Sequence, residues 1–171
     1  MKLTAGVEAA IRRHGEDTYP HECCGALVGA GDRINAAVAL PNTTEEGPRR
    51  RFLVRPSDYR MAEQQAGAQG GELLGFYHSH PDHPARPSQF DLDHAWPNFA
   101  YVIVAVAGPG EGNAHRSADE SNEGQPRRSA EGAEAGDMTV WFLKEDRSRF
   151  EEGDLNGDKN PDSNTAPAVH G

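Results

Sequence analysis

The chain has 171 residues, a length that suits a single domain with a buried hydrophobic core. Its formal net charge is −10, and the acidity gathers in two stretches: residues 108–137 hold seven acidic residues against three Arg, and residues 151–171 hold five against one Lys. The remainder is nearly neutral and has no basic stripe, which argues against a nucleic-acid partner. With no run near the ~20 apolar residues of a membrane span, and with Glu8 where a signal peptide needs an apolar core, we expect a cytoplasmic protein without membrane contact.

Hydrophobic periodicity and turn residues predict an alternation of strands and helices. The returns between neighbouring strands are short enough for hairpins in two places, so we expect a mixed sheet flanked by helices, an α/β fold. In chain order, the predicted elements are a helix at 3–14 stopped by Gly15, strands at 23–28, 33–40 and 52–54, a helix at 56–68, a strand at 72–80, a helix at 88–95, a central strand at 101–107, a strand at 138–143 and an edge strand at 147–151.

The segment 108–137 consists mainly of Gly, Glu, Ser, Asn and Arg and contains no bulky apolar residue. Such a segment cannot bury enough apolar surface to offset the entropy lost on ordering it. We therefore expect a disordered insertion between two strands, and the similar composition of residues 153–171 predicts a disordered acidic tail. The domain organisation predicted in this way is one catalytic domain over residues 1–152, interrupted by the insertion, followed by the tail.

A metal site is predicted where the strand over residues 72–80 ends. His78 and His80 are two residues apart, so their side chains point to the same side of a strand. Ser88 then begins a helix as its N-cap, and Asp91 lies in the first turn. Two imidazoles and one carboxylate leave a fourth position for water, as in catalytic rather than structural zinc sites. We therefore predict that His78, His80 and Asp91 bind Zn²⁺.

The His-x-His pair, followed after seven residues by Ser-x-x-Asp, resembles the signature of the JAMM (MPN+) metalloprotease family. His78, His80, Ser88 and Asp91 match its four marked positions. That family also has a Glu on an early strand, and residues 19–29 match this segment, with Glu22 at the position of the glutamate. The resemblance covers about residues 4–107 and resumes near residue 138. It implies a curved, mostly antiparallel sheet between helices.

The resemblance also implies an activity, which is zinc-dependent hydrolysis of an amide. Glu22 would act as general base and Ser88 would donate a hydrogen bond to the developing oxyanion. Family members cut peptide or isopeptide bonds at the C-terminus of ubiquitin or ubiquitin-like proteins. The likeness to short bacterial members implies a ubiquitin-like sulfur-carrier protein as the partner and substrate. The alternative is a non-catalytic scaffold or ubiquitin-like-binding module, the role of relatives that lost the metal ligands.

Each candidate residue also has a purely structural interpretation. Ser88 would only cap its helix, Asp91 would only be an acid favoured by the helix dipole, and Glu22 would only be a polar residue at a strand entrance. Cys23 and Cys24 are neighbours whose side chains point to opposite faces of a strand, so we do not expect a disulfide between them. We interpret both as small buried apolar residues, with zinc ligation as the alternative.

Overall fold

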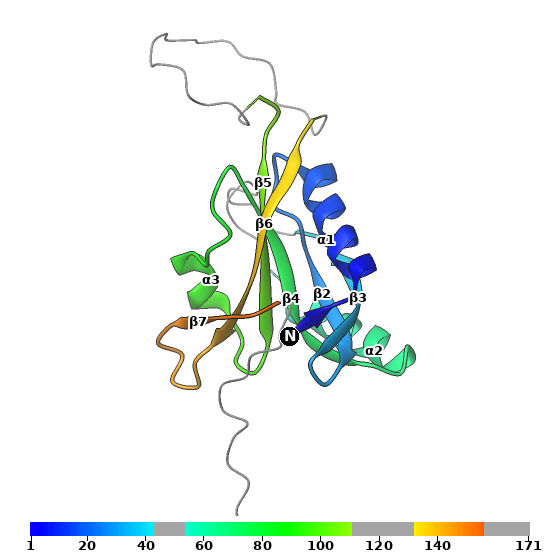
Figure 1. The fold of residues 1–171 in the computed structure, drawn as a ribbon. Coiled ribbons are helices and arrows are strands. Elements are labelled where there is room, and N and C mark those ends of the chain that lie inside the picture. The colour runs from blue at the N-terminus through cyan, green and yellow to red at the C-terminus, as the bar shows by residue number, and fades with distance from the viewer. Residues whose placement is uncertain (43–53, 111–131, 156–171) are drawn as a thin grey trace, which may run out of the picture.

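The computed structural model of the protein describes residues 1–42, 54–110 and 132–155. Three helices surround one sheet of seven strands in this part of the chain (Figure 1). Within these ranges, no helix combines the length and the hydrophobicity that a membrane crossing needs. The elements are β1 (Lys2–Leu3), α1 (Ala5–Thr18), β2 (Cys24–Ala30), β3 (Arg33–Leu40), α2 (Pro56–Ala68), β4 (Glu72–Pro81), α3 (Gln89–His94), β5 (Ala100–Ala107), β6 (Glu134–Leu143) and β7 (Phe150–Gly153).

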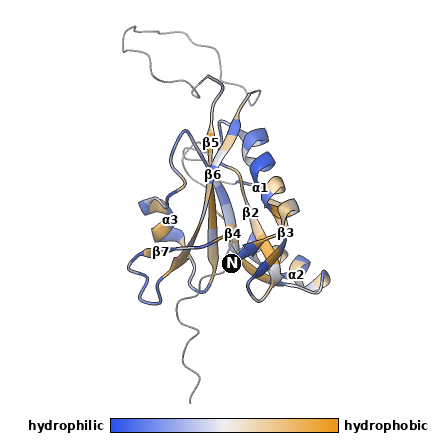
Figure 2. Cartoon of the chain, in the orientation of Figure 1, coloured by the Kyte–Doolittle hydropathy of each residue, from blue (hydrophilic) through white to orange (hydrophobic). Residues whose placement is uncertain are grey.

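The strands lie in the order β1-β3-β2-β4-β5-β6-β7. The β1–β3 and β4–β5 pairs are parallel, and the other four pairs are antiparallel. The fold class is therefore the predicted one, a mixed and mostly antiparallel sheet flanked by helices. Strand β5, predicted to be central, has β4 and β6 as neighbours and is buried along most of its length. Figure 2 shows this hydrophobic strand in the middle of the sheet, with hydrophilic residues along part of α1.

Two hydrophobic clusters fill the spaces on the two faces of the sheet. Successive residues of a strand point to opposite faces, so Tyr77 of β4 packs in the cluster that includes Ile11 of α1, and its neighbour Phe76 packs with Ala62 of α2. Cys23 and Cys24 divide between the clusters in the same way, and both are buried free cysteines. This confirms that they are small core residues on opposite faces.

Helix α1 differs from its prediction at both ends. It begins only at Ala5, because Thr4 is the N-cap and accepts a hydrogen bond from the backbone N–H of Val7, and the residues before Thr4 form β1. It also continues through Gly15 to Thr18. The prediction that Gly15 ends the helix was wrong because this glycine serves close packing: a Cβ there would lie 2.9 Å from a methyl group of Val106.

The first residues of two other strands also differ from the prediction. In β6 the backbone pairing extends beyond the apolar residues. Strand β6 begins at Glu134, four residues before the predicted start, since its first residues pair with the end of β5. Strand β7 begins at Phe150, later than the predicted edge strand.

The predicted strand at 52–54 lies outside the described residues except for Val54, which is not in a strand. Most of the predicted insertion and of the acidic tail, namely residues 111–131 and 156–171, also lies outside the described residues.

A pair of glycine substitutions tests the packing of β4 against β5. A Cβ at Gly75 would collide with the backbone carbonyl of Ala100 on the neighbouring strand, whereas a Cβ at Gly67, an exposed position of α2, would meet no atom within 4 Å. We expect Gly75→Ala to lower the free energy of unfolding by about 1–3 kcal/mol. Gly67→Ala should raise it by about 0.5–1 kcal/mol, because alanine is the better helix former. Chemical denaturation measures both changes, and equal stabilities of the two variants would contradict the close approach of Gly75 to Ala100.

Candidate metal centre

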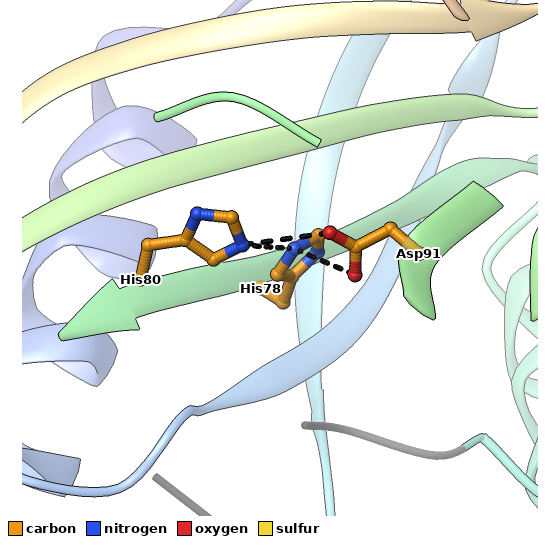
Figure 3. Close-up of side chains that lie close together, drawn as sticks. All are labelled: His78, His80 and Asp91. Carbon is orange, nitrogen blue, oxygen red and sulfur yellow. Dashed lines mark hydrogen bonds and ion pairs between the residues drawn. The ribbon is translucent and has the colours of Figure 1, made fainter. Parts of the chain in front are cut away.

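The end of strand β4 carries both candidate histidine ligands. His78 pairs with Cys24 of β2 on one side and Ile103 of β5 on the other, so its backbone lies in the middle of the sheet. His80 follows two residues later, opposite Ala105 of β5. The i and i+2 spacing in this strand points both rings to one face, and both side chains are buried. Figure 3 shows the two imidazoles turned towards the carboxylate of Asp91.

Asp91 owes its orientation to the start of helix α3. Ser88 is the N-cap, and its hydroxyl accepts a hydrogen bond from the backbone N–H of Asp91 at 3.2 Å. The carboxylate of Asp91 accepts in return from the backbone N–H of Ser88 at 2.6 Å and from its hydroxyl at 2.7 Å. This reciprocal cap fixes the first turn of the helix and holds the carboxylate at the histidines. Ser88 therefore caps helix α3, as its purely structural interpretation predicted.

The three side chains bring their ligand atoms together at distances that suit one metal ion. The two Nε2 atoms of His78 and His80 are 3.0 Å apart, and oxygens of Asp91 lie 3.4 Å from the first and 3.6 Å from the second. Ligand atoms bound tetrahedrally at ~2.0–2.1 Å, as in zinc sites, are separated by about 3.3–3.4 Å. Among the described residues, these three form the one group of such side chains close enough to hold a metal.

The hydrogen bond of His80 identifies which of its nitrogens faces the site. Nδ1 lies 2.8 Å from the backbone carbonyl oxygen of Pro84. A carbonyl only accepts, so Nδ1 carries the proton, and in its neutral form the ring has its lone pair on Nε2. Metal-binding histidines usually donate their second N–H in this way. The lone pair of His80 therefore points at a carboxylate, an arrangement that fits a cation between them.

The electrostatics of His78 and Asp91 agree with a cation site, whereas the pKa of His80, which burial lowers, is raised overall by its hydrogen bonds with Asp91 and Pro84. Burial lowers the pKa of the His78 imidazole, which favours its neutral form with a free lone pair. Burial alone would raise the pKa of Asp91, but the nearby imidazoles of His78 and His80 and the backbone N–H of Ser88 hold the pKa well below its usual range. A neutral imidazole beside an ionised carboxylate is the protonation state that metal binding requires.

Glu22 lies beside these three residues without belonging to their group. Cys24 pairs with His78, and the backbone N–H of Ser79 donates to the carbonyl of Cys23 at 3.1 Å, so the residues just before β2 lie next to the histidine end of β4. The buried carboxyl of Glu22 is close enough to His80 and Asp91 for the charges of both to act on its pKa. Burial raises the pKa of Glu22 to about 8, and the charge of His80 opposes this rise.

A cavity of about 510 Å³ lies next to the metal centre, and the sequence did not predict it. Asp91 belongs to its wall, and aromatic side chains from α2, β4, β5 and the α3 region form most of the rest. The hydroxyl of Tyr101 bonds both the N–H and the carbonyl of Trp96, so the wall is fixed, although the Trp96 side chain is 39% exposed. The lining residues are Val54, Tyr59, Phe76, Phe90, Asp91, Asp93, His94, Ala95, Trp96, Pro97, Tyr101 and Arg147.

Comparisons with known proteins agree with the fold and with the family resemblance of the sequence. A family model described as prokaryotic homologs of the JAB domain matches residues 4–119. A desampylase of Haloferax volcanii is 34% identical over 115 residues, which cover 63% of this chain and 82% of the relative. A probable TtuB-protein conjugate cleaving protease of Thermus thermophilus is 31% identical over 108 residues, covering 63% of this chain and 72% of the relative. The solution structure of a protein from Salinibacter ruber is 36% identical, with a TM-score of 0.61, and the match covers 99% of this chain and 97% of that one.

Proposed function

The chain belongs to the family of prokaryotic homologs of the JAB domain, the JAMM type of metallopeptidase, and from this premise we propose that it cuts the bond at the C-terminus of a ubiquitin-like protein with the help of Zn²⁺. The observation that carries the proposal is the convergence of His78, His80 and Asp91 in a buried site. The names of two relatives, a desampylase and a conjugate cleaving protease, support the choice of substrate class. Relatives without ligands are the basis for the alternative of a non-catalytic module, and here all three ligand positions are filled.

Zinc is the ion that we propose for the site. Two imidazole nitrogens and one carboxylate oxygen match the ligands of catalytic zinc sites. The distances between these atoms are close to those between ligand atoms around a tetrahedral zinc ion. When bound, zinc supplies a Lewis acid that activates water at neutral pH and polarises the carbonyl to be attacked. The three ligands come from two elements, the end of β4 and the first turn of α3, and they would leave a fourth position on the metal for water.

Glu22 is proposed to move the proton in the reaction. Its carboxylate accepts a proton from the attacking water and passes it to the leaving amine. Burial raises the pKa of Glu22, which makes its carboxylate a stronger base than an exposed one, and a nearby Zn²⁺ would favour the ionised form that accepts the proton. The backbone carbonyl of Glu22 accepts a hydrogen bond from the side chain of Asn42 at 3.1 Å, which holds the residue at the entrance of β2.

Ser88 is proposed to donate to the oxyanion that forms on the substrate. In the structure its hydroxyl donates to Asp91, so the hydroxyl would have to turn towards the substrate during the reaction. The backbone N–H of Ser88, at 2.6 Å from the same carboxylate, keeps Asp91 in place when the hydroxyl turns. The helix cap and the catalytic role are thus compatible in one residue.

The finer proposal is that the substrate is a sulfur-carrier protein of ubiquitin-like type, joined to an amine through its terminal glycine. The cavity beside Asp91 offers apolar surface for the residues that precede the terminal glycines. Glycine at the last positions would let the tail pass close to the metal centre, where a side chain would clash. Backbone pairing of such an extended tail provides affinity with few side-chain requirements.

A cleavage assay tests the substrate class. The substrate is a ubiquitin-like carrier joined through its C-terminal glycine to cysteine, and the comparison is the same carrier with Gly→Ala at its last residue. We expect cleavage of the first, a loss of at least about tenfold with the second, and inhibition by a zinc chelator in both cases. An unrelated unfolded protein serves as the control, and its digestion at an equal rate would identify a general peptidase and contradict the carrier proposal.

A further inference from the structure

The loop between the two halves of the metal centre makes a contact that the ligands themselves depend on. Residues 81–87 connect His80 to the N-cap Ser88, and the carbonyl of Pro84 in this loop accepts the hydrogen bond from Nδ1 of His80 at 2.8 Å. This bond selects the tautomer of His80 and the direction of its Nε2 lone pair. Any residue that fixes the position of the Pro84 carbonyl therefore acts on the metal centre.

Asp82 ties this loop to two distant elements. Its carboxylate accepts from the hydroxyl of Tyr19, after the end of α1, at 3.0 Å, and from the backbone N–H of Gly108, after β5, at 3.0 Å. Its own backbone N–H donates to the carbonyl of Val106 at 2.8 Å. Tyr19 and Gly108 are buried, so the partners of Asp82 are held by the core.

Two backbone features accommodate the contact between Asp82, Tyr19 and Gly108. Asp82 has a φ of +57°, a left-handed conformation that aspartate tolerates better than most residues. A Cβ at Gly108 would collide with the hydroxyl of Tyr19, so a glycine is needed for the tyrosine to reach Asp82. The turn after His80 thus depends on three residues that are far apart in the sequence.

The other side of Pro84 has an anchor of its own. The carbonyl of Ala85 accepts from the hydroxyl of Thr139 on β6 at 2.6 Å. That hydroxyl in turn accepts from the indole N–H of Trp141 at 2.8 Å, which leaves its proton directed at Ala85. Asp82 and Ala85 therefore hold the loop on both sides of the Pro84 carbonyl.

We infer that Asp82, held by Tyr19, is a positioning residue of the metal centre, which sets metal affinity by fixing the Pro84 carbonyl against His80. The inference rests on the proposed metal site and goes beyond it, because Asp82 itself is not in the group of possible ligands. Removing the tie should let the loop move and loosen the orientation of His80. Hydrogen-bond partners of metal-binding histidines typically change metal affinity by about 10–100-fold.

The variant that isolates the tie is Asp82→Gly. Glycine adopts a φ of +57° without strain, so the variant removes the carboxylate and its hydrogen bonds without straining the backbone. Tyr19→Phe removes one of these bonds and leaves Asp82 in place. The matched control is Tyr77→Phe, which removes a tyrosine hydroxyl at 2.8 Å from Nδ1 of His14, on the face of the sheet away from the metal centre.

The measurements are the zinc affinity, obtained by competition with a chelator, the visible absorption spectrum of the cobalt-substituted protein, and the Tm. We expect Asp82→Gly to weaken zinc binding by about 10–100-fold and to change the cobalt spectrum, with a smaller effect of Tyr19→Phe. Tyr77→Phe should affect only the Tm, if anything. Its zinc affinity and the spectrum of its cobalt form should be those of the wild type.

Wild-type affinity and an unchanged cobalt spectrum in both Asp82→Gly and Tyr19→Phe would overturn the inference, even if both variants had a lower Tm. Should Asp82→Gly fail to fold, Tyr19→Phe against Tyr77→Phe decides the question with the same two readouts. A wild-type chain that takes up no zinc or cobalt would overturn the proposed metal site and the inference with it, and this outcome is distinguished by the wild-type measurement alone.

Discussion

Glu22→Gln is expected to keep its metal and to lose hydrolytic activity by about 10²–10⁴-fold, the contribution that general acid–base catalysis typically makes. Glutamine has nearly the size of glutamate, so the buried space at the entrance of β2 stays filled. The amide cannot accept the proton of the attacking water, because its oxygen is far less basic than a carboxylate. The three candidate ligands are unchanged in this variant, which is why the metal content should stay the same.

The measurement compares kcat with the metal content of the same preparation. Glu145→Gln, an exposed glutamate after β6, is the control for the change of charge and should retain full activity. Retained activity in Glu22→Gln would remove Glu22 from the proposed mechanism. Loss of the metal together with activity would make Glu22 a ligand and not a base.

His80→Ala should abolish most metal binding. The wild type is expected to carry about one Zn²⁺ per chain on three protein ligands, and the variant removes one of them together with the Nδ1 hydrogen bond to Pro84. A site with only His78 and Asp91 would have two open positions and lose much of its affinity. Elemental analysis of purified protein, after dialysis against metal-free buffer, measures the stoichiometry.

His83→Ala is the matched control, since His83 is an exposed histidine three residues further along the same loop and outside the candidate group. It should bind as much zinc as the wild type. Equal zinc contents of His80→Ala and His83→Ala would contradict the ligand assignment, because the loss of a ligand and the loss of a surface histidine would then be indistinguishable.

The sequence predicted the chemistry of the site better than its surroundings. The strand period brings His78 and His80 to one face, and the helix cap orients Asp91 through Ser88, so both halves of the group follow from short-range rules. The position of Glu22 required the family resemblance, because it is 56 residues from His78 in the chain and comes close to the site only in the folded protein. The aromatic cavity beside Asp91 was missed, since its walls come from four separate segments.

The errors in the predicted helix and strand boundaries have the same origin, which is contact with residues far away in the sequence. Gly15 has the composition signal of a helix end, but the helix continues because the sheet lies so close that only a glycine fits. The first residues of β6 have no apolar pattern and join the sheet because β5 offers unpaired backbone groups. In both cases a partner that is distant in sequence decided the local structure.

The sequence by itself determined the mixed α/β fold, the strand and the helix that carry the candidate ligands, and the types of ligand atom, because these depend on residue spacing within one or two turns of chain. Only the tertiary structure decided that these atoms meet within 4.8 Å, that the carboxyl of Glu22 comes close to His80 and Asp91, and that Asp82 holds the intervening loop. The hydrogen bond from Tyr19 to Asp82 spans 63 residues, and that from Gly108 spans 26. Contacts of this kind leave no periodic signal in the sequence, since they arise from the packing of complete elements against one another.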